Sequence, residues 1–206
     1  MNVLVVDDHQ IVITGVELIL KNSLPFIAIE GMLTGEHLFS TLKKKDYSLV
    51  ILDINIPNVD IYNVIYQLKQ THPSIKILIF SMNPEELFAK RYLKLGADGY
   101  LMKSANGDEL VVAVEKIING GRYLSQKLLA RISEDALNGK SNNVLDDLSP
   151  REFEILKFLL QGYSIKEISS YTNLHHSTVS THKSKIFEKT GVKNILELIE
   201  IANQYK

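Results

Sequence analysis

Five polar side chains in the first half of the chain each follow a short apolar run, and their types suit phosphoryl chemistry. They are the acid pair Asp7 and Asp8, the carboxylate of Asp53, the hydroxyl of Ser81 and the amine of Lys103. A carboxylate can attack phosphorus as a nucleophile, and an amine can neutralise the charge that a phosphoryl group brings. These residues predict a site at which one carboxylate is phosphorylated and its new charge is detected.

The apolar runs that precede these residues predict buried strands. They cover residues 3–6, 49–52, 77–80 and 100–102, and each consists of aliphatic or aromatic side chains and methionine. Runs of this kind are typical of strands covered on both faces of a parallel sheet. Because ligand crevices in open α/β sheets lie beyond the carboxyl ends of such strands, we expect the polar residues to meet there.

The adjacent carboxylates of Asp7 and Asp8 predict a cation between them and a third acid. Without a cation, neighbouring carboxylates at a strand end cannot both be neutralised at low cost. Mg²⁺ suits such a site because it prefers hard oxygen ligands and often uses one or two carboxylates together with phosphate oxygens. Asp53 would then be nucleophile and ligand at once, with Lys103 as the counter-charge.

Each of these residues alone has a simpler interpretation. The acids would be solvated loop residues, Ser81 the cap of a turn and Lys103 a surface charge. The site is favoured because the groups follow four different predicted strands, an arrangement that chance rarely supplies.

Stretches of helical period separate the strand-like runs up to about residue 120 and give five repeats of strand followed by helix. Proline and glycine residues separate or close these segments: Pro25, Pro57, Pro73, Pro84, Gly96, Gly99, Gly120 and Gly121. Such repeats build right-handed crossovers and a parallel sheet covered on both sides. The predicted fold of this part is a doubly wound α/β sandwich.

The remainder of the chain predicts a small helical domain after a linker. One helix is expected over residues 124–137, followed by a polar linker over 138–143. Ser149, Pro150 and Glu152 have the spacing of a capping box with proline at the first helical position. Three or four short helices follow, with boundaries marked by Gly162, Ser164, Asn173 and Gly191.

The bulk composition is that of an ordinary globular protein. The 206 residues carry a net charge of −1, with 45% apolar and 23% charged residues and no cysteine. Disulfides and cysteine metal sites are excluded, and disordered and fibrous classes are disfavoured. No apolar stretch approaches the roughly eighteen residues of a membrane span, and no signal-peptide pattern follows Met1. We therefore expect a cytoplasmic protein that does not bind a membrane.

Residues 161–168 and 173–186 have the pattern of a helix-turn-helix. With Val179, Ile186 and Phe187 facing inward, the outer surface of the second helix would carry hydroxyl and lysine side chains that can contact DNA. The residues expected at DNA are Ser180, Thr181, Lys183, Ser184, Lys185 and Lys189. Because basic and acidic residues balance from 141 to 206, a solvated face on a small interaction domain is the alternative.

The first part resembles the receiver domains of bacterial two-component response regulators. The resemblance covers residues 1 to about 120, and its motifs are VVDDH at 5–9, LDINIP at 52–57, Ser81 and GADGYLMK at 96–103. It implies a flavodoxin-like five-stranded sheet with Asp53 as the phosphoacceptor. It also implies Mg²⁺ bound by Asp8, Asp53 and the backbone carbonyl of Asn55, with Asp7 helping through water.

The resemblance also assigns a switch. Ser81 would turn inward to hydrogen-bond the phosphoryl oxygen, Tyr100 would follow into the vacated space, and Lys103 would contact the phosphate. One position departs from the family, because Ile61 stands where such domains usually have glycine. A β-branched residue resists a backbone that glycine tolerates, so either the loop after Asp53 takes another path or the site is retuned.

The second part resembles the LuxR-type DNA-binding domain, and the whole chain resembles transcription factors of the NarL/FixJ type. The matching residues are LSPRE at 148–152, Gly162, KEI at 166–168, Thr178, Val179, His182, Ile186 and KTGVKN at 189–194. The chain then divides into a receiver at 1–122, a linker helix and flexible linker at 123–146, and a DNA-binding domain at 147–206.

Three features depart from the LuxR-type pattern. His175 stands where a serine cap is usual, Thr190 where a leucine usually packs, and serines where relatives carry lysines. Fewer basic contacts predict a shallow dependence of DNA binding on salt. The last helix, over residues 195–202, is the expected dimer contact of the active homodimer, although its apolar residues could also complete the core.

The resulting hypothesis is a DNA-binding transcriptional regulator that a histidine kinase phosphorylates on Asp53, and that performs no catalysis beyond its own phosphorylation and dephosphorylation. One alternative is a regulator independent of phosphorylation, whose receiver is a dimerisation scaffold. The other is a phosphohydrolase with Asp53 as nucleophile. Such enzymes usually have a second carboxylate two residues later, where this chain has Asn55.

Overall fold

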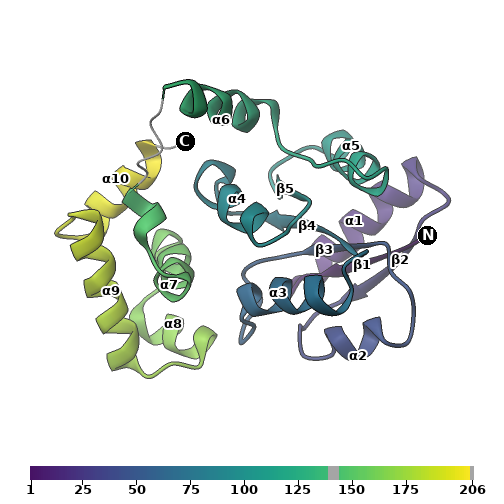
Figure 1. Ribbon diagram of the computed structural model, residues 1–206. Helices are drawn as coiled ribbons and strands as arrows, with labels where there is room; N and C mark the ends of the chain where they lie inside the picture. Colours follow the sequence, from purple (N-terminus) through teal and green to yellow (C-terminus); the bar gives the residue numbers. More distant parts are fainter. Residues whose placement is uncertain (139–143, 205–206) are drawn as a thin grey trace. The chain divides into compact units, whose positions relative to one another are not determined.

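A computed structural model describes residues 1–138 and 144–204, and the chain divides into two compact units (Figure 1). The first unit covers Met1–Leu128 and the second covers Leu129–Lys206. Of the polar linker predicted over 138–143, only Asn138 lies within the described residues.

The first unit is built on a parallel five-stranded sheet with the order β2-β1-β3-β4-β5. The strands are β1 (Asn2–Val6), β2 (Ala28–Met32), β3 (Leu49–Leu52), β4 (Lys76–Ser81) and β5 (Gly99–Met102). This order is flavodoxin-like, so the predicted fold is confirmed. The sequence alone did not place β2, which lies at an edge and has no fully buried residue.

Helices cover both faces of the sheet. They are α1 (Gln10–Ser23), α2 (Leu38–Leu42), α3 (Ile61–Thr71), α4 (Glu85–Lys94) and α5 (Gly107–Ile118). Helices α1 and α5 lie on one face, and α2, α3 and α4 lie on the other (Figure 1). The central strands β1 and β3 are almost entirely buried, which explains their unbroken apolar runs.

The loops after β3 and β5 each end in a residue whose side chain caps the following helix. Asp60 accepts a hydrogen bond from the backbone N–H of Asn63, and Asn106 accepts one from that of Glu109. These caps fix where the loops after β3 and β5 end. Gly99, predicted to close an element, instead opens β5.

The second unit is helical. Its elements are α6 (Gln126–Asn138), which begins in the first unit, the short 3₁₀ helix η1 (Val144–Asp147), α7 (Pro150–Leu160), α8 (Ile165–Thr172), α9 (His176–Thr190) and α10 (Ile195–Gln204). The predicted capping box of Ser149 and Glu152 is present at α7. Asn173 and Gly191 end α8 and α9 in the left-handed conformation.

Helices α8 and α9 form the helix-turn-helix, with α9 packed against α7 and α8. Val179 and Ile186 are fully buried on the inner side of α9. Burial of such side chains stabilises a fold by about 1.5–3 kcal/mol each. No helix among the described residues is both long enough and apolar enough to cross a membrane.

Candidate phosphoacceptor site and nucleic-acid interface

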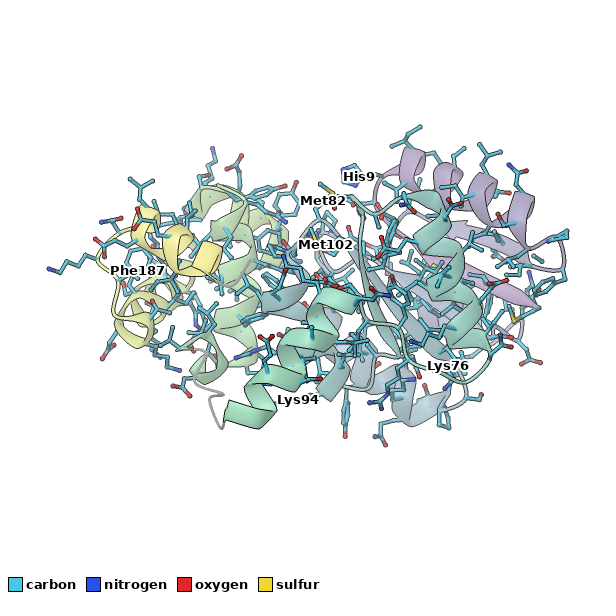
Figure 2. The ribbon with its side chains drawn as sticks, turned by 90° about the horizontal axis from the view of Figure 1, so that it is seen from above. His9, Lys76, Met82, Lys94, Met102 and Phe187 are labelled. Atoms are coloured by element: carbon cyan, nitrogen blue, oxygen red, sulfur yellow. The ribbon has the colours of Figure 1, made fainter. Side chains whose placement is uncertain are left out.

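The carboxyl ends of β1, β3, β4 and β5 bring the predicted site residues to one rim of the sheet. Val6 pairs with Leu52 and Ser81 pairs with Met102, so the residues that follow lie side by side. Figure 2 labels His9, Met82 and Met102 along this rim.

Lys103 joins two buried carboxylates at the centre of the site. Its Nζ lies 2.9 Å from Asp53 Oδ2 and 2.6 Å from Asp7 Oδ2. Asp53 is 2% exposed and Asp7 is 1% exposed. The second oxygen of Asp53 accepts a hydrogen bond of 2.7 Å from the backbone N–H of Ile54. The sequence prediction that Asp7, Asp53 and Lys103 converge therefore agrees with the geometry.

Burial raises the pKa of Asp53, and repulsion from Asp7 adds to this, while the attraction of Lys103 opposes both. For Lys103, burial lowers the pKa of the ammonium, but the two carboxylates outweigh burial and raise the pKa overall. Lys103 therefore stays charged near neutral pH. Two acids share one cation, so added cationic charge would relieve the excess negative charge.

Asp8 and His9 extend the acidic group toward solvent. His9 Nδ1 lies 2.7 Å from Asp8 Oδ1, but the contact lacks hydrogen-bond geometry, and this buried oxygen has no hydrogen-bond partner among the described residues. One ligand atom from each of Asp7, Asp8 and His9 lies within 4.8 Å of the others. His9 had no predicted role at the site, although its position beside the acid pair was a signal.

The predicted switch residues are also adjacent. Tyr100 is fully buried, and its hydroxyl donates to the backbone oxygen of Asn83 at 2.9 Å and hydrogen-bonds the Ser81 side chain. Ser81 Oγ accepts from the N–H of Asn83 at 3.2 Å. Burial raises the pKa of the Tyr100 hydroxyl, so it remains a neutral donor. Asn83 also reaches Asn55, with Nδ2 donating to Oδ1 at 3.3 Å.

Ile61 fits the loop after Asp53 without backbone strain. It is the first residue of α3, is 2% exposed and does not have a positive φ. Asn58 instead takes the left-handed conformation, with φ of 60°. The loop therefore follows a path that does not require glycine at position 61, which answers the question raised by the sequence.

Helix α9 presents most of the predicted DNA-contacting residues. Thr181, Ser184 and Lys185 are exposed, while Ser180 and Lys183 are partly buried. The Thr181 and Ser184 hydroxyls donate to helix carbonyls of the preceding turn, which leaves their oxygens as acceptors.

Comparison with known proteins identifies both parts of the chain. Residues 3–115 match the model of the response regulator receiver domain, and residues 146–202 match that of the luxR family of bacterial regulatory proteins. The chain belongs to the two-component response regulators of the NarL/FixJ type.

Two relatives match over nearly their full length. The response regulator GacA of Pseudomonas protegens is 30% identical, with 98% of this chain and 95% of GacA covered. The virulence-factor positive transcription regulator BvgA of Bordetella pertussis is 32% identical, with 98% of this chain and 96% of BvgA covered.

A solved structure of RcsB from Salmonella enterica serovar Typhimurium is also similar. It is 27% identical, with a TM-score of 0.72 and 98% of each chain covered. That RcsB structure is bound to the promoter rprA in the presence of the phosphomimetic BeF₃⁻.

In this response regulator, Lys189 differs from the other predicted DNA contacts. Its Nζ lies 2.8 Å from Glu152 Oε2 and 3.2 Å from the backbone oxygen of Asp147. Burial raises the pKa of Glu152, but hydrogen bonds from Lys189 and Ser149 prevail and hold that pKa at about 2. Lys189 therefore ties α9 to the start of α7.

Two of the three departures from the luxR family pattern are single residues on α9 or at its start. His175 is the exposed N-cap of α9, and its side chain makes no capping hydrogen bond. Thr190 is buried where a leucine is usual, and its hydroxyl donates to the carbonyl of Ile186 at 2.7 Å. The buried hydroxyl is thus satisfied within α9.

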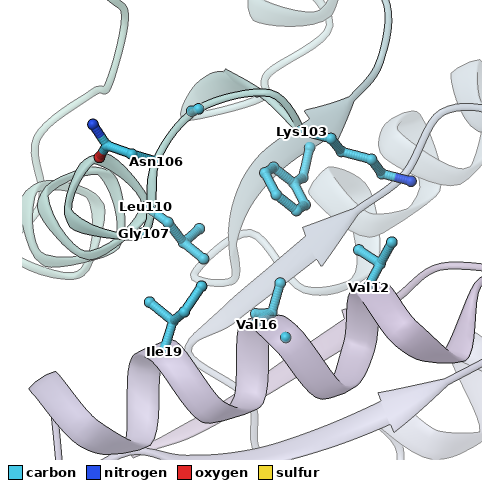
Figure 3. A pocket seen from close by; sticks show the side chains of 10 residues that line it. Val12, Val16, Ile19, Lys103, Asn106, Gly107 and Leu110 are labelled. Atoms are coloured by element: carbon cyan, nitrogen blue, oxygen red, sulfur yellow. The ribbon is translucent and has the colours of Figure 1, made fainter.

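The receiver domain has an apolar cavity of about 180 Å³ beside the site, between α1 and α5 (Figure 3). Its lining residues are Val12, Gly15, Val16, Ile19, Phe80, Lys103, Ala105, Asn106, Gly107 and Leu110. The methylene stem of Lys103 borders the cavity while its ammonium binds the carboxylates. Lys103 is thus positioned by apolar packing at its stem and by charge at its tip.

Proposed function

We propose that this response regulator accepts a phosphoryl group on Asp53 from a histidine kinase and thereby changes its binding to promoter DNA. A carboxylate oxygen of Asp53 would attack phosphorus as the phosphorus–nitrogen bond to the kinase histidine breaks, and the histidine nitrogen would leave with the bond's electron pair. The observation that best supports this proposal is the buried Asp53 carboxylate, which lies 2.9 Å from the Lys103 ammonium.

The residues around Asp53 fit the Mg²⁺ that receiver domains typically bind. Asp8 offers a buried oxygen that has no hydrogen-bond partner among the described residues, and a carboxylate oxygen of Asp7 lies within 4.8 Å of an Asp8 oxygen. Lys103 joins Asp7 to the carboxylate of Asp53. Asp8, Asp53 and the carbonyl of Asn55 would hold the ion, with Asp7 assisting. When bound, Mg²⁺ would neutralise charge on the transferring phosphoryl group.

Ser81, Tyr100 and Lys103 would detect the new charge. The Ser81 hydroxyl would hydrogen-bond a phosphoryl oxygen. The Lys103 ammonium would form an ion pair with the phosphate in addition to its carboxylate partners. Tyr100 already occupies an inward position, where Asn83 holds its hydroxyl. Phosphorylation would therefore increase the population of an arrangement that this fold already accommodates.

The DNA-binding half would use α9 in the major groove. Ser180, Thr181 and Ser184 would contact base edges or phosphates, and Lys183 and Lys185 would contact phosphates. Lys189 would support this surface through its ion pair with Glu152. The active form would be a homodimer with α10 at the contact, where Leu196 is exposed.

With a receiver and a DNA-binding half, the domain limits would be 1–122 for the receiver, 123–146 for the linker and 147–206 for the DNA-binding domain.

Exposed Ile11 and Met82 flank the acidic rim and would provide apolar contacts for the kinase. The protein would act in the cytoplasm, because it must reach both a kinase and the chromosome.

A regulator that acts independently of phosphorylation is the second candidate. The complete burial of Tyr100, whose hydroxyl donates to the backbone oxygen of Asn83, supports this candidate. In that case the receiver would serve as a dimerisation scaffold.

Treatment with acetyl phosphate, or with beryllofluoride and Mg²⁺, distinguishes the two candidates. We expect the wild type to be modified at Asp53, and Asp53→Asn to be unmodified. We also expect the wild type to gain at least fivefold in promoter affinity, which is the lower end of usual allosteric coupling. Modification without a change in affinity or oligomeric state would support the scaffold.

A further inference from the structure

A short segment that follows α5 contacts the same elements as the switch residue Tyr100. This segment, Gly121–Leu128, is named the linker strap, and its last residues form the start of α6 (Figure 1). All of it lies within the first unit.

The first part of the linker strap is bonded to the edge strand β5. Tyr123 forms a parallel bridge with Gly99, and its N–H donates to the carbonyl of Asp98 at 3.0 Å. The N–H of Tyr100 in turn donates to the carbonyl of Tyr123 at 3.2 Å. The backbone of the switch residue is thus directly hydrogen-bonded to the strap.

Side chains fix this part of the strap. A Cβ at Gly99 would lie 3.0 Å from the carbonyl oxygen of Tyr123 and 2.8 Å from Ile117 Cδ1, so the close approach requires glycine. Tyr123 is buried, and its hydroxyl donates to Glu109 on α5 at 2.7 Å.

The second part of the strap is bonded to the first turn of α4. The Ser125 hydroxyl donates to Glu85 and accepts from the N–H of Leu128 at 3.1 Å, so it also caps α6. Lys127 Nζ lies 2.8 Å from Glu86 Oε1. Both acids are largely buried, and α4 begins shortly after Ser81, the last residue of β4, and Asn83.

The two ends of the strap therefore bond to the two elements between which Tyr100 is held. Tyr100 uses its N–H for the strap and its hydroxyl for Asn83, one residue before the cap of α4. A shift of Tyr100 or of the start of α4 would strain the hydrogen bonds of Tyr123, Ser125 and Lys127 together.

We propose that the linker strap couples the position of Tyr100 to the linker helix α6, so that the inward arrangement of Tyr100 and the bonded strap stabilise each other. The proposal rests on the proposed function, because it names the route by which a phosphoryl group on Asp53 would reach the linker. The coupling is reciprocal: weakening the strap must reduce the effect of phosphorylation on whatever α6 controls.

The test uses charge reversal in the full chain. Lys127→Glu places two acids together and should detach the strap, whereas Glu86→Lys combined with Lys127→Glu restores an ion pair. Ser125→Ala removes the bond to Glu85 without a change of charge. Lys44→Glu, at an exposed lysine after α2, is the matched control.

Two quantities are measured with and without beryllofluoride and Mg²⁺: promoter affinity, and hydrogen exchange of peptides over residues 121–128. We expect Lys127→Glu and Ser125→Ala to reduce the beryllofluoride-induced gain in affinity about fivefold, with faster exchange in the strap. The double variant and Lys44→Glu should stay within twofold of the wild type. Acetyl phosphate should still modify Asp53 in all of them.

Failure of this proposal differs from failure of the proposed function. If the wild type does not respond to beryllofluoride, phosphorylation control itself fails. If the wild type responds and the strap variants respond equally, despite faster exchange at 121–128, the strap does not couple Tyr100 to α6.

Discussion

At the scale of single residues, the site carries more negative charge than its surroundings neutralise. Asp7 and Asp53 are buried and share the ammonium of Lys103. Charge is costly to bury, and one cation cannot fully compensate two acids. Added cationic charge at this site would therefore stabilise it.

Asp53→Asn should stabilise the folded chain at pH 7. Burial raises the folded pKa of Asp53 above its ordinary value, so folding favours the protonated carboxyl, and ionisation costs stability above the folded pKa. This loss of stability becomes smaller as the pH falls through the pKa that Asp53 has in the folded protein. The neutral amide should raise the unfolding free energy by about 1 kcal/mol at pH 7.

The measurement is urea denaturation at pH 7 and pH 4, with Asp46→Asn at an exposed site as the control. The gain should shrink at pH 4, because Asp53 in the wild type is then closer to neutral. A loss of stability at pH 7 would contradict this account of the site.

The identities of these residues were predictable because each follows an apolar run, and parallel strands bring such positions to one rim. The roles of His9 and Asn83 were not predictable in the same way. The His9 contact with Asp8 and the Asn83 bonds to Tyr100 and Ser81 depend on loop conformations that no periodic pattern encodes.

At the scale of elements, Ile61 contributes apolar burial at the start of α3. Its side chain is 2% exposed and Asp60 caps the helix in front of it. Ile61→Gly, which introduces the usual family residue, should remove this packing and lower helix propensity. We expect a loss of about 3 kcal/mol in unfolding free energy, measured by urea denaturation.

Modification of Ile61→Gly by acetyl phosphate should match that of the wild type under conditions where the variant is folded. Ile61→Val should cost only about 1 kcal/mol, since the β-branched shape is kept. A marked increase in the modification of Ile61→Gly would show instead that Ile61 restrains the chemistry of Asp53.

Glu152 links two helices of the DNA-binding domain. Its pKa of about 2 lies below its ordinary value, so its contribution to stability is complete above about pH 4.5 and is lost as the pH falls toward 2. Glu152→Gln keeps the capping box but loses the ion pair with Lys189. It should cost about 1 kcal/mol at pH 7.

Circular dichroism of urea unfolding at pH 7 and pH 3 measures this difference. The variant should lose less stability than the wild type between the two values, because it has no carboxylate to protonate at this position. Glu188→Gln, exposed on α9, is the control and should follow the wild type.

Burial decides which elements the sequence predicts. The strands β1, β3, β4 and β5 are largely buried, and their apolar runs matched the observed bounds within one residue. The edge strand β2 has polar and glycine residues within AIEGM, so no run marked it. The start of α7 was predictable because a capping box is local in sequence.

At the scale of the whole molecule, the balance of charge sets how DNA binding responds to salt. The chain has a net charge of −1, and Lys189 is already paired with Glu152. Lys183 and Lys185 remain as the predicted phosphate contacts of α9. The lysines of α9 could be predicted from the sequence. The ion pair between Lys189 and Glu152 could not, because it joins residues far apart in the chain.

The logarithm of the DNA-binding constant should fall with the logarithm of salt concentration with a slope of about −2 per protomer, since each phosphate contact contributes about −0.9. Lys185→Ala should reduce the steepness by about one per protomer. Lys189→Ala should change it little, because its ammonium is held within the domain. Titrations between 50 and 200 mM salt, roughly the physiological range, test this. Equal changes in the two variants would place Lys189 at the DNA.

The bond between Tyr123 and β5 also affects how the receiver behaves when many copies are present. An unpaired strand at the side of a sheet is a template to which a strand of another molecule can add, and this starts aggregation. Here the main chain of residue 123 already uses the N–H of Tyr100 and the carbonyl of Asp98. The backbone around Tyr123 therefore protects the β5 edge of the sheet from pairing with another molecule. Substitutions that break its hydrogen bonds to β5 should reduce solubility.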